Sequence, residues 1–448
     1  MSTRRDVASE RLEPDCYERN FADIKPALTQ HQAAVEADRC YFCFDAPCTT
    51  ACPTGIDIPD FIQKIRSENL IGSAADILGA NIFGAMCARV CPVETLCEQA
   101  CVRNTAEEKP VAIGALQRHA TDVVLRDNVQ LFTRAPPSGR RVAVVGGGPA
   151  GLSCAHRLAM LGHEVVVFEA RARLGGLNEH GIAAYKVNGG IAQREIDYLL
   201  EIGGIEVHTG TRLGEQVTLE QLRAGYDAVF LGIGLADVNA LGIESEAVPG
   251  VVDAVRYIEA LRQAPELSAL PVGRRIVVIG GGMTAIDIAV QTRLLGADEV
   301  TIVYRRGPEA MGASQWERDL AQSQGVKLRY WSRPRRLILD GGEATGVEVE
   351  RTLLVDGALV GSGETEVLAA DMVFKAIGQK IVTDPLDASA ADILDTRAGR
   401  LRVDAGRRTS LGNVWAGGDC IGTSQDLTVA AVEDGKRAAL DIHRVLGA

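Results

Sequence analysis

The sequence lacks an excess of basic residues and any long apolar run. Its 47 lysines and arginines face 59 aspartates and glutamates, and the net charge of −12 disfavours broad binding to nucleic-acid phosphates. No apolar stretch is long enough to cross a bilayer, and residues 1–6 lead into polar sequence instead of the apolar core of a secretory signal. We therefore expect a soluble cytoplasmic protein with no membrane and no nucleic-acid partner.

Cysteine is scarce over most of the chain. Of the 11 cysteines, eight lie between Cys40 and Cys101, and the others are Cys16, Cys154 and Cys420. A chain of this length without an export signal belongs in a reducing compartment, where clustered cysteines hold metal more often than they form disulfides. The chain after Cys101 contains no cysteine pair, which argues against a redox disulfide there.

The 448 residues exceed what one hydrophobic core usually supports, so two or three domains are expected. The clustered cysteines lie among helical-looking segments, and the prolines and glycine of residues 133–139 then mark a linker. After it, short Val/Ile runs such as 141–145 and 276–279 alternate with helical segments, which indicates buried parallel strands. We predict an α/β protein, with an N-terminal α-helical domain followed by two Rossmann-like nucleotide-binding domains. The predicted boundaries are 1–132 for the helical domain, 133–245 with 380–448 for the first nucleotide domain, and 246–379 for the second.

Two dense runs of cysteines have spacings typical of iron–sulfur proteins. The first run reads Cys40-x2-Cys43-x4-Cys48-x3-Cys52-Pro, and the second run reads Cys87-x3-Cys91-Pro-x4-Cys97-x3-Cys101. In ferredoxin-type runs three thiolates surround one cluster, and the last cysteine before proline reaches a second cluster. We therefore predict two [4Fe–4S] centres, with Cys52 and members of the second run on one of them. Structural zinc and disulfides are the alternatives for these spacings.

A glycine turn at Gly146 follows a Val-rich strand and precedes a helix, where glycines let the backbone approach a pyrophosphate. Glu169 closes the next strand, at the place of the acid that accepts hydrogen bonds from a ribose. Two later segments resemble the second and third FAD contacts of flavoproteins with two dinucleotide domains, and the last helix begins with amides suited to a flavin ring. The predicted FAD residues are Gly146, Gly148, Pro149, Ala150, Gly151, Glu169, Gly176, Leu177, Gly418, Asp419 and Thr428.

A second glycine turn, at Gly280, ends in alanine, which the dinucleotide fingerprint permits. The two turns form a coarse internal repeat, so we expect a second dinucleotide, NAD(P)H. Where an acid would indicate NAD, the sequence has an arginine pair that would grip a 2′-phosphate, and a solvated loop edge is the alternative. The predicted residues of this site are Gly280, Gly282, Met283, Thr284, Ala285, Arg305, Arg306 and Gly378.

With these motifs, essentially the whole chain resembles the module shared by dihydropyrimidine dehydrogenases and the small subunit of bacterial glutamate synthase. The resemblance implies that the nucleotide is NAD, although the arginine pair favours NADP. It also implies that Lys186 lies near the flavin, although a position on the surface is the default expectation for a lysine. Cys87 would be a spare, buried thiol. The implied cluster ligands are Cys40, Cys43, Cys48 and Cys101 for one cluster, and Cys52, Cys91, Cys97 and the amide of Gln117 for the other.

Residues 231–235, Gln117 and residues 426–436 are closer to the pyrimidine branch of this family. That branch implies an electron-input subunit in which NADH gives a hydride to FAD and single electrons pass through both clusters. An FMN-containing partner subunit, expected in a heterotetramer, would then reduce uracil or thymine to the 5,6-dihydro form. The alternatives are a glutamate synthase small subunit, a ferredoxin–NAD(P) oxidoreductase subunit, or, in another class, a non-catalytic iron–sulfur scaffold.

Overall fold

The computed structural model describes residues 6–244, 246–384, 386, 390–395, 399–422 and 425–447. By its tertiary contacts the chain divides into two compact units, which are described separately below. The first unit comprises Met1–Ile24, His180–Asn188 and Asp237–Lys380, and the second comprises Lys25–Glu179, Gly189–Ala236 and Ile381–Ala448, as far as these ranges are described.

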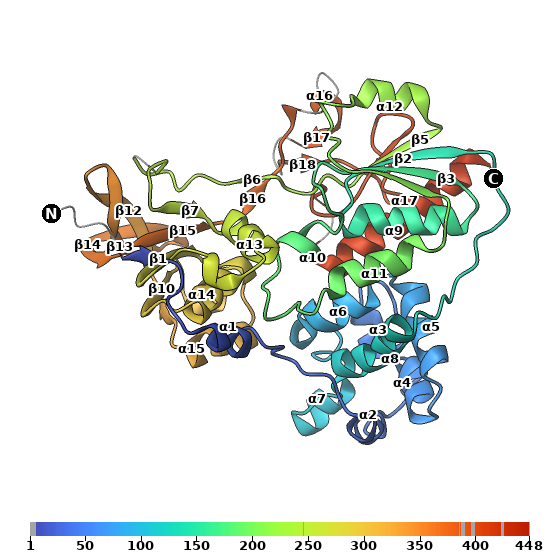
Figure 1. The fold of residues 1–448 in the computed structure, drawn as a ribbon, viewed down its shortest axis with the longest axis horizontal. Helices are drawn as coiled ribbons and strands as arrows, with labels where there is room; N and C mark the ends of the chain where they lie inside the picture. The colour runs from blue at the N-terminus through green and yellow to red at the C-terminus, as the bar shows by residue number, and fades with distance from the viewer. Residues whose placement is uncertain are drawn as a thin grey trace. The chain divides into compact units, whose positions relative to one another are not determined.

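Short helices make up the N-terminal part of the second unit, in blue to cyan in Figure 1. Thr29 starts the first of them with a capping box, and Asp57 and Asn69 cap two later helices by accepting hydrogen bonds from backbone N–H groups. Their apolar faces enclose Phe61 and Phe83, which are fully buried. The prediction of an α-helical N-terminal domain is confirmed. The helices are α2 (Gln30–Ala37), α3 (Pro47–Ala51), α4 (Ile58–Arg66), α5 (Leu70–Ala80), α6 (Gly84–Val90), α7 (Val102–Glu107) and α8 (Ile113–Asp127).

A five-stranded parallel sheet in the order β19-β5-β2-β3-β4 completes the second unit. The C-terminal helix α17 (Thr428–Leu446), in red in Figure 1, lies alongside α9 (Pro149–Met160), where a Cβ on Gly435 would be 2.1 Å from the carbonyl oxygen of Ala150. The C-terminal helix thus packs with the first nucleotide fold. The strands are β2 (Arg141–Val145), β3 (Glu164–Phe168), β4 (Ile205–His208), β5 (Ala228–Leu231) and β19 (Val414–Ala416), and the other helices are α10 (Leu177–His180), α11 (Ile191–Leu200), α12 (Leu219–Gly225) and α16 (Ala390–Ile393). A small ribbon pairs β17 (Leu394–Asp395) with β18 (Arg400–Leu401).

The first unit contains the second parallel sheet, in the order β11-β10-β9-β15-β7, and an antiparallel sheet in the order β12-β13-β14. The parallel strands are β7 (Val251–Asp253), β9 (Arg275–Gly280), β10 (Glu299–Val303), β11 (Lys327–Arg329) and β15 (Met372–Ala376). The antiparallel strands are β12 (Ser332–Asp340), β13 (Glu343–Val355) and β14 (Ala358–Ala369). The helices are α1 (Pro14–Asn20), α13 (Ala254–Gln263), α14 (Met283–Leu294) and α15 (Gln315–Ser323). Two short ribbons pair β1 (Val7–Ala8) with β8 (Val272–Gly273), and β6 (Asp237–Val238) with β16 (Gln379–Lys380).

The two compact units group the chain differently from the three predicted domains, which stay a prediction. The helical part and the first nucleotide fold form one unit, and the described residues of 1–24, 180–188 and 237–245, with Lys380, belong to the other unit. Residues 6–24 pack with the second nucleotide fold, because Tyr17 and Phe21 enter the same apolar core as Ile286 of α14. Residues 180–188 also belong there, since Tyr185 lies in that core. Among the described residues no single helix is long and apolar enough to span a membrane; α5 and α6 pass such a test only when taken together across an 86° bend.

Candidate cofactor sites

The turn between β2 and α9 allows close approach of a phosphate. Gly146 has a φ of +99°, and a Cβ there would lie 2.2 Å from the carbonyl oxygen of Gly232. Gly148 is the N-cap of α9 and Pro149 follows it, so the first turn of this helix has free N–H groups. These groups and the positive end of the helix dipole would stabilise an anion.

Glu169 follows β3 and reaches back to this turn. Its Oε2 accepts a hydrogen bond from Gly147 N at 2.7 Å, and its Oε1 accepts one from Arg171 N at 2.7 Å. The side chain is buried, and each carboxylate oxygen retains a further lone pair. Glu169 is therefore fixed in place with acceptor capacity for ribose hydroxyls, and its cofactor role stays a prediction.

The three predicted FAD segments converge at the start of α9. A Cβ on Gly176 would lie 2.9 Å from the Cα of Gly148, and a Cβ on Gly418 would lie 3.0 Å from the Cβ of Ala150. Segments separated by hundreds of residues thus form one cradle with little room for side chains. Leu177 adjoins this cradle as the first residue of α10.

Asn178 and Thr428 form a polar pair next to the cradle. Thr428 Oγ1 donates to Asn178 Oδ1 at 2.7 Å. Asn178 is 1% exposed, and its Nδ2 finds no hydrogen-bond partner among the described residues. A buried N–H group costs free energy unless it meets an acceptor, and the carbonyl or ring nitrogen of a flavin is such an acceptor. The residues present therefore fit a bound flavin dinucleotide. Asn178 is not among the predicted site residues, although it directly follows the predicted contact Leu177 and begins the segment that resembles the family's flavin region.

Asp419 is partly buried beside other acidic groups. Burial and the neighbouring charge of Asp426 together raise the pKa of its carboxyl group to about 6, while Arg400 opposes the shift. Arg400 forms a bidentate ion pair with Asp426 at 3.0 Å and also donates to the backbone oxygen of Asp419. This arrangement fixes the turn and leaves the Asp419 carboxyl group as an acceptor suited to ribityl hydroxyls.

The second glycine turn, between β9 and α14, has similar geometry. Gly280 has a φ of +149°, and a Cβ there would lie 2.0 Å from the carbonyl oxygen of Ala376. Gly282 is the N-cap of α14, whose first residues are Met283, Thr284 and Ala285. Gly378, with a φ of +89°, follows β15 at the same carboxyl edge of the sheet. The backbone therefore supports a second dinucleotide site at this edge.

Arg305 and Arg306 lie directly after β10, at that edge. Their backbone oxygens accept hydrogen bonds from Thr352 Oγ1 at 2.7 Å and from Trp331 N at 3.1 Å, which fixes the loop. Both side chains are exposed. The ring of Tyr304 fills the space beside Gly281, where a Cβ would lie 2.4 Å from the ring. The loop thus offers guanidinium groups, which favour a 2′-phosphate.

Lys186 packs on the nucleotide helix of the first unit. Its Nζ lies 2.7 Å from Asp287 Oδ1 of α14 and 2.9 Å from Glu317 Oε1 of α15, and Tyr185 Oη donates to Asp287 Oδ1 at 3.1 Å. Burial alone would lower the pKa of Lys186, but the two carboxylates raise it above its usual value. The default expectation of a solvated surface lysine is wrong. A role near the flavin stays a prediction.

The first cysteine group comprises Cys40, Cys43, Cys48 and Cys101. Burial raises the pKa of Cys48 to about 11, and the neighbouring thiols of Cys101 and Cys40 contribute. Burial also raises the pKa of Cys40, with contributions from Cys101 and Cys43. Each of these four thiols thus lies close enough to another member to affect, or be affected by, its ionisation, and iron binding would supply the positive charge that the thiolates need.

The second group comprises Cys52, Cys87, Cys91 and Cys97. A hydrogen bond with Cys87 is the largest of the causes that raise the pKa of Cys91, followed by burial and by the charges of Cys97 and Cys52. Cys87 is buried, as expected of a spare thiol, but it contacts Cys91, which directly follows α6 one helical turn further along the chain.

Gln117 Nε2 donates to Gly84 O at 2.7 Å. Its ligand role stays a prediction, and Cys87 is a second candidate for the fourth position. Among the described residues, no three His, Cys, Asp or Glu side chains are placed to hold a single metal ion.

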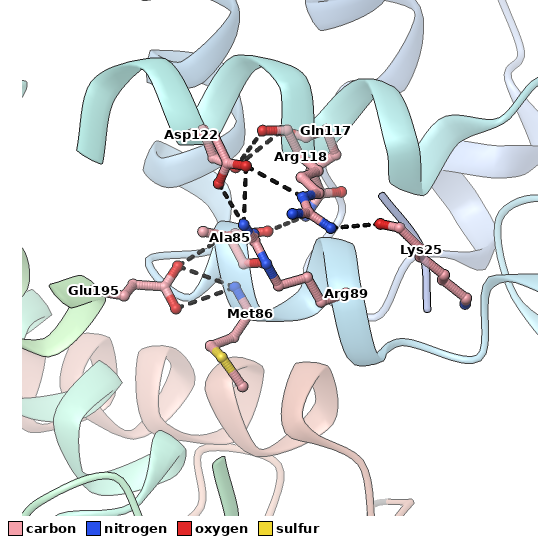
Figure 2. A network of polar contacts seen from close by, with 10 residues as sticks. Lys25, Ala85, Met86, Arg89, Gln117, Arg118, Asp122 and Glu195 are labelled. Carbon is pink, nitrogen blue, oxygen red and sulfur yellow. Dashed lines mark hydrogen bonds and ion pairs between the residues drawn. The ribbon is translucent and has the colours of Figure 1, made fainter. Parts of the chain in front are cut away.

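A buried polar network connects α6, which carries Cys87, to α8 and α11 (Figure 2). Glu195 of α11 is 0% exposed and accepts hydrogen bonds from Ala85 N at 2.7 Å and Met86 N at 3.2 Å. Burial raises the pKa of Glu195 to about 8, although the two backbone hydrogen bonds and Arg89 oppose the shift. Arg89 pairs with Asp122 of α8 at 2.7 Å. The carboxyl group of Glu195 thus links α11, which belongs to the first nucleotide fold, to α6, which carries Cys87.

A helical cysteine domain joined to two dinucleotide folds defines the class, an NAD(P)H-dependent flavin and iron–sulfur oxidoreductase. A family model described as dihydropyrimidine dehydrogenase domain II, 4Fe-4S cluster, matches residues 17–129. A second model, described as pyridine nucleotide-disulphide oxidoreductase, matches residues 140–435. The predicted fold class and the predicted FAD, NAD(P) and 4Fe-4S cofactors are confirmed.

Two curated relatives have nearly the same length as this chain. The NAD-dependent dihydropyrimidine dehydrogenase subunit PreT of Salmonella typhimurium is 33% identical, with 96% of this chain and 98% of the relative covered. The glutamate synthase (NADPH) small chain of Escherichia coli K12 is also 33% identical, with 94% and 92% covered. The chain belongs to the family of these two proteins, the iron–sulfur-containing members of the pyridine nucleotide-disulphide oxidoreductases.

Solved structures share the two-domain dinucleotide fold. FprA of Mycobacterium tuberculosis in complex with NADPH has a TM-score of 0.58 at 21% identity, with 70% of this chain and 85% of that chain covered. The thioredoxin reductase of T. acidophilum has a TM-score of 0.55 at 22% identity, with 69% and 100% covered. At this identity the likeness concerns the fold alone.

Proposed function

We propose that this chain is the electron-input subunit of a dihydropyrimidine dehydrogenase. The observation that carries the proposal is the presence, in one chain, of two cysteine groups and two dinucleotide turns, with a relative of matching length named as such a subunit. NADH is the reductant in this proposal. An FMN-containing partner, in a heterotetramer in the cytoplasm, reduces uracil or thymine to the 5,6-dihydro form.

Bound FAD and clusters would supply hydride acceptance and single-electron transfer. The chain's own residues would bind and orient these groups. The first turn of α9 would neutralise the pyrophosphate of FAD, and Glu169 would accept hydrogen bonds from the ribose. Asn178 Nδ2, with its amide fixed by Thr428, would donate to the flavin ring, and Asp419 would accept from the ribityl chain. No general acid or nucleophile from the chain is required.

The nucleotide preference rests on opposing observations. The PreT relatives are named as NAD-dependent, whereas the exposed Arg305 and Arg306 and the NADPH-linked glutamate synthase relative favour NADPH. The proposal takes NADH, since the pyrimidine branch supplies the function as a whole. Steady-state kinetics with both nucleotides decide this point, and a higher kcat/KM with NADPH would overturn it.

The proposed ligands of one cluster are the first cysteine group. Those of the other are Cys52, Cys91 and Cys97, with Gln117 as the fourth. An amide in place of a thiolate makes the cluster less negative and should raise its potential. The hydrogen bond from Gln117 Nε2 to Gly84 O leaves the amide oxygen as the ligating atom.

The test is anaerobic co-expression with candidate FMN subunits, followed by assays of NADH-dependent uracil and thymine reduction. The second candidate function, a glutamate synthase small subunit, is supported by equal identity to that relative. It predicts glutamine-dependent glutamate formation with the corresponding large subunit. Glutamate formation without pyrimidine turnover by any pair would replace the proposal with this second function.

A further inference from the structure

Three exposed apolar side chains are direct sequence neighbours of cysteines of the first group. Phe44 is 101% exposed, Tyr41 is 52% exposed and Val102 is 40% exposed. Each of them directly follows a cysteine of the first group in the sequence. By contrast, no residue that follows a second-group cysteine is among the exposed large apolar residues of the described chain. We call Tyr41, Phe44 and Val102 the apolar rim.

The loop that presents Phe44 is held in an uncommon conformation. Phe42 has a φ of +50°, in the left-handed region that bulky residues rarely adopt. Its backbone N donates to Cys40 Sγ at 3.4 Å, and the guanidinium of Arg66 lies 5.7 Å from the centre of its ring. Conformations of this kind persist where the surroundings enforce them, and they cluster at functional sites. The chain therefore keeps Phe44 in solvent instead of folding it onto a nearby core.

The side chain of Tyr41 is held in place by contacts within the chain. The guanidinium of Arg103 lies 4.1 Å from the centre of the Tyr41 ring, and the Tyr41 hydroxyl donates to Glu107 Oε1 at 3.1 Å. Arg103 itself pairs with Glu107, and Arg66 pairs with Asp38 at 2.7 Å. Since these ions around the rim are already paired within the chain, an incoming surface would gain chiefly from burial of apolar groups.

We infer that the apolar rim is the docking surface for the electron-accepting partner subunit, which receives Phe44 in an apolar pocket. The inference rests on the proposed function, because that function requires an acceptor polypeptide. Electron transfer between proteins needs short distances, and each rim residue is the direct sequence neighbour of a cysteine of the first group. The partner therefore meets this chain at the first cysteine group. Aromatic anchors in pockets are the usual hot spots of such interfaces.

The test compares Phe44→Ser with Ile71→Ser, a control that removes an apolar side chain of 39% exposure from α5 of the same helical domain. The probe is the FMN-containing subunit that supports pyrimidine reduction with the wild-type chain. Anaerobic titration calorimetry should show affinity at least about tenfold weaker for Phe44→Ser and nearly unchanged for Ile71→Ser. Iron, acid-labile sulfide and NADH-dependent dye reduction should equal wild type in both variants.

Equal affinity of wild type and Phe44→Ser, with full iron content, would overturn the inference. If Phe44→Ser loses iron, a photoreactive benzoylphenylalanine at position 44 preserves the aromatic ring and replaces that comparison. It should crosslink to the FMN subunit, and crosslinking only to a second copy of this chain, or to nothing, contradicts the inference. If no FMN subunit supports turnover with the wild-type chain, the proposed function itself fails.

Discussion

Replacing Glu195 by glutamine should make the free energy of unfolding depend less on pH. Glu195 is fully buried between α11 and the first turn of α6, and the charged groups that act on it are Arg89 of α6 and Asp122 of α8. Burial is the dominant effect on its carboxyl group, and it raises the pKa to about 8. Glutamine keeps an oxygen acceptor for the N–H of Ala85 and cannot ionise.

The sign follows from comparing folded and unfolded states. The carboxyl group has a pKa near 4.5 when unfolded and about 8 when folded, so the folded state binds the proton more tightly. Its stabilising contribution is complete below pH 4.5 and is lost as the pH rises towards 8. At roughly 1.4 kcal/mol per pH unit, the loss amounts to about 5 kcal/mol of unfolding free energy.

The assay is anaerobic urea unfolding at about pH 5 and about pH 8, followed by circular dichroism. Wild type should lose stability over this range, and Glu195→Gln should lose much less. Asp197→Asn removes a carboxyl group from the exposed face of the same helix and should behave like wild type. Parallel pH profiles for wild type and Glu195→Gln would refute the argument from burial.

Three further predictions concern the cofactor sites. Arg305→Ala should raise the KM for NADPH by about 10- to 100-fold and leave the KM for NADH nearly unchanged, since a charged hydrogen bond contributes about 1.5–3 kcal/mol; equal changes for both nucleotides would contradict contact with a 2′-phosphate. Gly151→Val should abolish FAD retention, measured as the flavin-to-protein ratio, because a Cβ would lie 1.9 Å from the carbonyl oxygen of Gly146; full flavin content would be the opposing result. Gln117→Cys should lower the midpoint potential of one cluster, because the new thiolate adds negative charge, and unchanged potentials would leave Cys87 as the candidate for the fourth ligand.

Local sequence patterns predicted much of the fold. The predicted run at 141–145 is strand β2 with these bounds, and the run at 276–279 lies within β9. Each predicted glycine turn connects a strand to a helix. The reason is that strand alternation, a helix N-terminus and a φ above zero are all set by a few neighbouring residues. The converging FAD segments were predictable for the same reason, since each carries its own glycines.

Features that depend on distant packing were not predictable. Tyr17 lies far in sequence from the other residues of the core that buries it, and no pattern in its segment indicates which core it enters. Glu195 bonds to backbone groups about 110 residues earlier, which leave no mark in the sequence. Lys186 gives no sign that two carboxylates from α14 and α15 surround it. In each case the partner is set by the tertiary fold.

The central claim is that this chain passes electrons from a reduced nicotinamide through flavin to clusters held by its two cysteine groups. The most direct test is anaerobic stopped-flow mixing of the purified holoprotein with NADH or NADPH, with flavin absorbance and freeze-quenched electron paramagnetic resonance recorded in parallel. The account predicts that the flavin bleaches first and that signals of reduced [4Fe–4S] clusters follow in the same sample. A flavin that stays oxidised with both nucleotides, or one that bleaches while no cluster signal appears at any time, would contradict it.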